Sequence, residues 1–337
     1  MVRLRPQSKS AAGYGETRRS RYATSAGRVT SGVYSIGRPQ PMKHWCVALL
    51  VGACCMRPAA VLAQAKPTNI HVSVLDSKGD PVTGLTAADF VVKEDNVARE
   101  VLKAEPATEP LTVALLVDDS QALTAGVQFI RDGARDFVKT LAGKADIAVI
   151  TFGERPTIAL DYTRDEQAVL ATLNRIFPRS GAGSYLLDTI VETSKGLQKK
   201  EAARPVIVVL MLEDVEFSNR YYEQVLNELD RSHAALHVVA IGTPDAGVNS
   251  DEIRNRNMVV AEGTSRTGGR RDQVLALSGA PARMAQLAKE LLNQYTVTYA
   301  RPETLIPPER VDVSTTRPGL TVRAPHKVPS TKTRDTP

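Results

Sequence analysis

Strongly apolar segments alternate with amphipathic segments through the middle of the chain. The apolar runs have the length of buried strands and lie at residues 111–117, 146–152, 206–212 and 236–241. The amphipathic segments repeat apolar residues every three or four positions and predict helices at 127–141, 165–177, 185–197, 220–231 and 282–293. With an edge strand at 157–162 and a last strand at 295–300, this alternation predicts a doubly wound (Rossmann-like), mostly parallel α/β sheet of about six strands.

Shorter strand patterns flank this main domain and predict an accessory β unit. Residues 69–76 alternate between apolar and polar as a half-buried strand does, and two more strands follow within residues 85–104. Near the other end, residues 309–314 and 320–323 predict a hairpin that joins the same unit. We therefore expect a small β unit at 67–107, the main domain at 110–300, a C-terminal β hairpin at 301–325 and a disordered tail at 326–337.

Residues 42–65 have the pattern of a secretory signal peptide. A basic start at Met42-Lys43-His44 precedes an interrupted apolar run, and the small residues Ala63 and Ala65 suit a signal-peptidase cut. This leader predicts an exported protein, either periplasmic or secreted. In the alternative, Val51-Gly52-Ala53-Cys54 is a bacterial lipobox, and a lipid on Cys54 attaches the protein to a membrane. Residues 1–41 are rich in Arg, Ser and Gly, and we expect them to be disordered or untranslated.

The positive charge of the chain is confined to its start. The whole sequence has 43 Lys and Arg against 37 Asp and Glu, but residues 1–63 hold ten of the basic residues and only one acidic residue. The remainder is slightly acidic, which argues against nucleic acid as a partner. All three cysteines lie before residue 56, so we expect no disulfide and no thiolate metal site in the main domain.

Oxygen-bearing residues follow the predicted central strands. Asp118-Asp119-Ser120-Gln121-Ala122 comes after the strand at 111–117, and Glu213-Asp214 comes after the strand at 206–212. Between them, Gly181-Ala182-Gly183-Ser184 opens a helix. In doubly wound sheets, ligands bind at the carboxyl ends of the strands, where these loops are expected to converge. Carboxylate and hydroxyl oxygens are ligands that suit Mg²⁺, Ca²⁺ or Mn²⁺.

This ordered series resembles the von Willebrand factor A family. The family carries Asp-x-Ser-x-Ser after its first strand, a Thr that opens a mid-domain helix and an Asp after its fourth strand. The matching positions here are Asp118, Ser120, Ser184 and Asp214. The resemblance implies that these four residues hold Mg²⁺, or else Ca²⁺ or Mn²⁺, and that the metal completes its coordination with an acidic side chain of a protein partner. Ala122 replaces the second Ser and removes one ligand oxygen, for which Asp119 and Gln121 are candidate replacements.

The resemblance also covers the flanking segments. Residues 74–90, 291–299 and 317–323 resemble a subgroup of exported bacterial proteins that carry this domain. The expected function is therefore protein–protein binding at the cell envelope through a degenerate metal-ion-dependent adhesion site, and not catalysis. The partner and the oligomeric state are not specified by the sequence.

Two alternatives stay open. A structural or scaffold protein would keep the fold and bind without metal, which the loss of an oxygen at Ala122 favours. A hydrolase is the more remote alternative, because no His lies in a loop at the same end to activate Ser120 or Ser184. The glycine-rich basic segment 263–271 is expected to be a flexible loop, with its Gly-Gly pair in a structural role.

Overall fold

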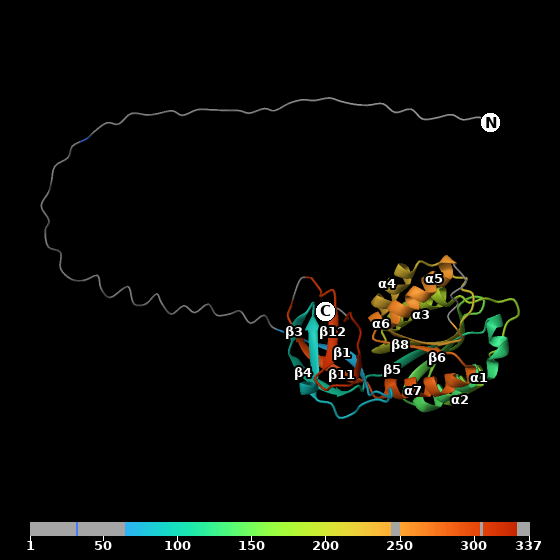
Figure 1. The fold of residues 1–337 in the computed structure, drawn as a ribbon, viewed down its shortest axis with the longest axis horizontal. Helices are drawn as coiled ribbons and strands as arrows, with labels where there is room; N and C mark the ends of the chain where they lie inside the picture. The colour runs from blue at the N-terminus through green and yellow to red at the C-terminus, as the bar shows by residue number, and fades with distance from the viewer. Residues whose placement is uncertain (1–31, 33–64, 244–249, 304–305, 329–337) are drawn as a thin grey trace, which may run out of the picture. The chain divides into compact units, whose positions relative to one another are not determined.

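The computed structural model of the protein describes Gly32 and residues 65–243, 250–303 and 306–328 (Figure 1). Of residues 1–65, only Gly32 and Ala65 are described. The predicted signal peptide, with its lipobox alternative at Cys54, and the segment 1–41 therefore lie otherwise outside the described residues. Within the described ranges, no helix is long and apolar enough to cross a membrane.

The main sheet has six strands, as the sequence predicts. Their order is β10-β9-β8-β5-β6-β7, and every neighbouring pair is parallel except β6 with β7. The strands are β5 (Leu111–Val117), β6 (Ala145–Thr151), β7 (Thr157–Thr163), β8 (Arg204–Leu212), β9 (Ala235–Ile241) and β10 (Arg271–Val274). Central strands that are covered on both faces read as nearly continuous apolar runs, which is why they could be found in the sequence. The doubly wound α/β class is confirmed.

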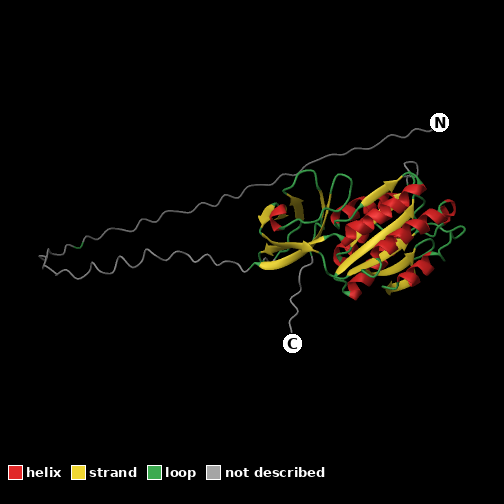
Figure 2. Cartoon of the chain, turned by 90° about the horizontal axis from the view of Figure 1, so that it is seen from below, coloured by secondary structure: helices red, strands yellow, loops and turns green. Residues whose placement is uncertain are grey.

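Helices cover both faces of this sheet (Figures 1 and 2). One face packs against α1 (Val127–Leu141), α2 (Glu166–Leu173) and α7 (Ala280–Leu292). The opposite face packs against α3 (Leu186–Lys200) and α4 (Tyr222–Ser232). The chain then forms α5 (Asp251–Met258), a π-helix at Val259–Gly263 and α6 (Thr264–Arg266). Alternate residues of each central strand enter the two cores, so Leu115 packs with α1 and Leu116 packs with α3.

The strand predicted last in the main sheet belongs elsewhere. β11 (Tyr295–Arg301) lies in a four-stranded sheet of order β13-β1-β11-β4, with β1 (Lys66–Leu75), β4 (Val101–Pro106) and β13 (Thr321–Arg323). The sixth place in the main sheet is taken by β10. The reason is visible in β11, where Tyr295, Val297 and Tyr299 are buried and the threonines between them are half-buried. That alternation suits an antiparallel sheet with one covered face.

The predicted C-terminal hairpin is also corrected. β12 (Val311–Thr315) pairs with β2 (Phe90–Glu94) in a three-stranded sheet that includes β3 (Val97–Arg99), whereas β13 pairs with β1. The two strands therefore do not pair with each other, although both join the early strands as expected. The second of the two strands predicted within residues 85–104, at 97–104, is likewise divided between two sheets, with β3 in one and β4 in the other. Except for β3, these strands share one apolar core.

Two segments predicted to be irregular are ordered. The expected loop at 263–271 contains the end of the π-helix, α6 and the start of β10. Its Gly269 has a structural role, because an added Cβ would lie 1.8 Å from the carbonyl oxygen of Leu236. The expected tail begins with His326, whose amide and carbonyl bond the backbone of Arg266 and Val311 over 2.8 and 2.7 Å. These bonds fix the start of the predicted tail, and residues 329–337 lie outside the description.

Candidate functional site

The three loops predicted to converge lie together at the carboxyl edge of the main sheet. The amide of Gln121 donates to the carbonyl of Ala182 over 3.0 Å, and the amide of Ser184 donates to the carbonyl of Val215 over 3.2 Å. The loops after β5, before α3 and after β8 are therefore joined to one another by their backbones. Convergence at this edge follows from parallel pairing, which places the carboxyl ends of neighbouring strands side by side.

Asp118 and Ser120 lie beneath the surface of this edge. Both are fully buried. One carboxylate oxygen of Asp118 accepts the Ser120 amide over 2.8 Å, and the other accepts the Leu212 amide over 3.2 Å. Burial raises the pKa of Asp118 above its usual value, and these contacts oppose the rise. The Ser120 hydroxyl, although near the Asp118 carboxyl, makes no well-formed hydrogen bond among the described residues.

Ser184 contacts an acid that the sequence analysis missed. Its hydroxyl donates to a carboxylate oxygen of Glu216 over 3.4 Å, and among the described residues it makes no hydrogen bond to Asp214. Glu216 is 2% exposed, and its other oxygen accepts the Ser218 amide over 3.1 Å. Burial raises the pKa of Glu216 to about 7. The only sequence signal was an acid between two apolar residues just after a buried strand, which does not indicate that the acid turns inward.

The two proposed replacement ligands are engaged elsewhere. Asp119 forms an ion pair with Arg179 at 2.7 Å, and its other oxygen accepts the Gly153 amide over 2.6 Å. The side-chain oxygen of Gln121 accepts the Gly181 amide over 2.8 Å. Both carboxylate oxygens of Asp119 and the side-chain oxygen of Gln121 therefore already accept hydrogen bonds from neighbouring loops.

A buried cation lies behind the loop that follows β8. Arg256 of α5 is 1% exposed and forms an ion pair with Glu213 at 2.8 Å. Its guanidinium also donates to the backbone carbonyl of Asp214. This pair neutralises Glu213 and fixes the main chain on the side of Asp214 that faces away from solvent. No local pattern in the sequence connects residue 256 with residues 213 and 214.

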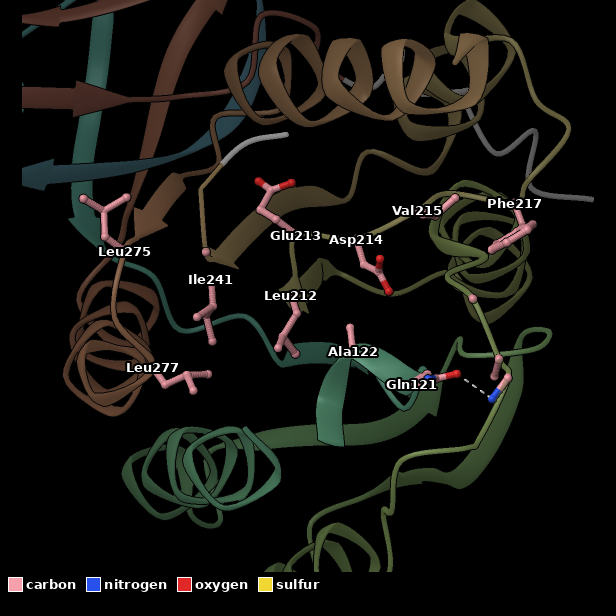
Figure 3. Close-up of a pocket in the computed structure, with 14 residues that line it drawn as sticks. Gln121, Ala122, Leu212, Glu213, Asp214, Val215, Phe217, Ile241, Leu275 and Leu277 are labelled. Atoms are coloured by element: carbon pink, nitrogen blue, oxygen red, sulfur yellow. Dashed lines mark hydrogen bonds between the residues drawn. The ribbon is translucent and has the colours of Figure 1, made fainter. Parts of the chain in front are cut away.

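Asp214 lines a pocket of about 630 Å³ at this edge. It is the only one of the four predicted metal ligands that does so. In Figure 3 its carboxylate points into the space above Ala122, whereas the Glu213 side chain points away. Among the described residues, no hydrogen bond or ion pair holds the Asp214 carboxylate. The apolar side chains that line the pocket are Ala122, Ala182, Leu212, Val215, Phe217, Ile241, Leu275 and Leu277.

Residues 113–212 match the family model of the von Willebrand factor type A domain. The main domain is a von Willebrand factor type A domain. This confirms the family that Asp118, Ser120, Ser184 and Asp214 indicated in the sequence. Comparison with curated proteins finds no match.

Several solved structures are similar to this von Willebrand factor type A domain and its surroundings. A von Willebrand factor type A protein from Catenulispora acidiphila is 9% identical, with a TM-score of 0.46, and the match covers 77% of this chain and 72% of that one. An aerotolerance-related membrane protein from Bacteroides fragilis is 16% identical, with a TM-score of 0.43, over 53% of this chain and 99% of that one. Proximal thread matrix protein 1 from the mussel byssus, with a zinc-occupied MIDAS motif, is 14% identical, with a TM-score of 0.45, over 60% and 50% of the two chains.

The donor groups of this von Willebrand factor type A domain do not fit a complete divalent-cation site. Mg²⁺ takes about six oxygen ligands and Ca²⁺ six to eight. Within the described ranges, no three His, Cys, Asp or Glu side chains form a group that could hold a metal ion. Asp118 uses both carboxylate oxygens on backbone amides, and the Arg256 guanidinium adds positive charge behind the loop. The buried, unbonded Ser120 hydroxyl does suit a ligand, so metal binding by the four residues stays a prediction.

Proposed function

We propose that this protein binds another protein through the pocket at the carboxyl edge of its von Willebrand factor type A domain, and that it does so without a bound metal and without catalysis. The observation that carries the proposal is the pocket itself, which combines exposed apolar side chains with one unpaired carboxylate. Phe217 is 52% exposed and Leu275 is 74% exposed. Apolar side chains that gather around a concave site commonly mark a protein-binding surface.

The aromatic side of the pocket is shaped for contact by its neighbours. The ring of Phe217 stacks on Tyr185, with their centroids 6.0 Å apart. It also lies against Gly183, where an added Cβ would be 1.9 Å from the ring. Gly183 therefore lets the ring lie flat over the loop that opens α3. A ring held in this way loses little further freedom when a partner packs on it.

Binding is favoured over catalysis by the chemistry of the lining residues. No His or Cys of the described ranges lines the pocket, and Ser120 and Ser184 are buried beneath it. A serine nucleophile needs an adjacent base to accept its proton. Ser184 has only Glu216 as a bonded acid, and both groups are closed off from the pocket.

Loss of the apolar lining is expected to abolish partner binding. The full chain and a variant with Val215→Ser and Phe217→Ser are immobilised and used to capture proteins from the cells that make it, in excess EDTA. We expect the native surface to capture a defined partner and the variant to lose at least ~90% of it, because central aromatic contacts dominate such interfaces. Phe177→Ser is the matched control, since Phe177 is 62% exposed and lies outside the pocket lining.

The same capture decides the role of metal. Metal-free binding is supported if the partner stays captured in EDTA and if titration of Mg²⁺, Ca²⁺ or Mn²⁺ into the full chain gives no heat. Capture that needs a divalent cation, with heat that disappears in Ser120→Ala, would restore the adhesion-type mechanism. Equal capture by the native chain and the Val215/Phe217 variant would place the binding surface elsewhere.

We further propose that the protein works outside the cytoplasm. This rests on the signal-peptide pattern at residues 42–65, which lies almost entirely outside the described residues. The first residue of the mature protein, read by mass spectrometry from fractionated cells, should fall shortly after Ala63 or Ala65. A lipid-modified Cys54 would support the lipobox alternative, and an uncleaved cytoplasmic chain would contradict export.

A further inference from the structure

We propose that the pocket at the carboxyl edge receives a lysine or arginine side chain, which the partner carries on a short apolar segment. The inference rests on the proposed function and adds the chemistry of the partner. It reverses the charge expected for a metal-dependent adhesion site, where the partner supplies an acid.

The charge of the pocket lining is the first argument. Among the described residues that line the pocket, the charged side chains are Glu213 and Asp214, and none is Lys, Arg or His. Glu213 is already neutralised by Arg256 at 2.8 Å. Asp214 is left as a carboxylate that no described residue pairs with, pointing into the pocket (Figure 3). A basic group is the complementary partner for this carboxylate, and an acidic group would be repelled by it.

The walls around Asp214 are the second argument. Leu212, Ile241 and Leu277 provide apolar surface within the pocket. Lysine and arginine both have aliphatic stems that pack on such surface while the charged end reaches a polar group. The half-exposed ring of Phe217 lies in the same lining, and an aromatic ring attracts a guanidinium or ammonium group. A hydrated metal ion would gain nothing from these walls.

The size of the pocket indicates that more than one side chain is received. At about 630 Å³ it is an open depression with room for a basic side chain and its neighbours. Val215 and Leu275 are 38% and 74% exposed at its rim, where the residues next to the basic side chain would lie. Apolar neighbours on the partner would cover them. The fitting segment is therefore a basic residue flanked by apolar ones.

A library of random short peptides displayed on phage tests this inference with the full chain as bait. Selection in excess EDTA should enrich peptides with Lys or Arg beside Leu, Val, Ile or Phe. Binding of the enriched peptides should fall ~10-fold in Asp214→Asn, which keeps the size of the side chain and removes its charge. In Asp214→Lys the selection should reverse and enrich Asp or Glu. Glu192→Gln is the matched control, because Glu192 is exposed on α3 and lies outside the pocket lining.

Each other result overturns the inference in a distinct way. Enrichment of acidic peptides that needs Mg²⁺ would indicate a metal-bound site. Enrichment of purely apolar peptides that bind Asp214→Asn equally well would remove the role of the carboxylate, yet leave the proposed binding surface in place. If no peptide is enriched over a support without the protein, the preference for a basic segment is rejected. The capture experiment with the Val215/Phe217 variant then tests the proposed function separately.

Discussion

Replacing Arg256 with methionine is expected to destabilise the protein by about 3–5 kcal/mol, the range for breaking one side of a buried ion pair. The guanidinium is 1% exposed, and Glu213 opposite it has a side chain that is only 5% exposed. Methionine keeps much of the apolar stem but leaves the Glu213 carboxylate and the Asp214 carbonyl without their donor. The free energy of unfolding, measured by urea titration at neutral pH, checks the prediction.

The helix that carries Arg256 supplies its own control. Arg254 is 70% exposed and pairs with Asp251, which is 77% exposed, so Arg254→Met should change stability by no more than about 0.5 kcal/mol. Adding Glu213→Gln to Arg256→Met should recover part of the loss, because it removes the carboxylate left without a partner. An Arg256→Met variant as stable as the native chain would mean that the pair does not hold the loop after β8. Peptide selection with Arg256→Met as bait would show whether the pocket keeps its shape when the loop after β8 loses this ion pair.

The strands of the main sheet could be predicted because each is buried on both faces. Residues 111–117 and 206–212 read as continuous apolar runs, and they became β5 and most of β8. Helix α1 was predicted with its observed bounds, since its buried residues recur at helical spacing. These elements are specified by local pattern. The sequence also indicates the connections between them, because parallel strands need crossover helices.

The pairing of the short strands could not be predicted in the same way. Only two residues separate β11 from the end of α7. Its partners are nevertheless β1 and β4, which lie about 200 residues earlier in the chain. β12 and β13 are close in sequence, but they pair with β2 and β1 and not with each other. An antiparallel partner is chosen by which apolar faces meet, and this depends on the assembled core more than on nearby residues.

In the candidate site, too, the positions of the loops could be predicted from the sequence, but the contacts of their side chains could not. The rule that loops converge at the carboxyl ends of parallel strands placed Asp118, Ser184 and Asp214 at one edge. The sequence could not show that Ser184 turns toward Glu216, or that Arg256 neutralises Glu213 from a helix more than 40 residues further on. Matching a motif by position identifies the loop, but the side-chain partners depend on how deeply each residue is buried.

Two buried groups are expected to give the protein opposing pH responses. His237 of β9 is fully buried, and neither ring nitrogen has a hydrogen-bond partner among the described residues; burial lowers its pKa to about 4. Because the unfolded chain takes up this proton near pH 6.5, the His237 contribution to stability falls as pH drops from about 6.5 to 4, by about 3 kcal/mol in all. Burial is the largest cause of this lowered pKa; Arg323 and Arg270 lower it further, and Glu290 opposes them.

Glu216 acts in the opposite direction. Burial raises its pKa to about 7, whereas the unfolded chain loses this proton near pH 4.5. Its contribution to stability therefore falls as pH rises from about 4.5 to 7, by a similar amount of about 3 kcal/mol. Asp118, whose pKa burial also raises, adds to the same trend. Between pH 4.5 and 6.5 the slopes from His237 and Glu216 oppose each other, so the native chain should show a shallow dependence.

Single substitutions should expose each slope. In His237→Leu, stability should rise more as pH falls from about 7 to 4.5 than it does in the native chain, because the opposing contribution of His237 is removed and that of Glu216 remains. In Glu216→Gln it should instead fall from about 6.5 to 4. Glutamine suits this position, since its oxygen can accept the Leu187 and Ser218 amides and its nitrogen can donate to the Ser184 hydroxyl. Urea unfolding of the three proteins between pH 4 and 8 measures both slopes, and parallel curves for all three would show that neither group titrates as its burial requires.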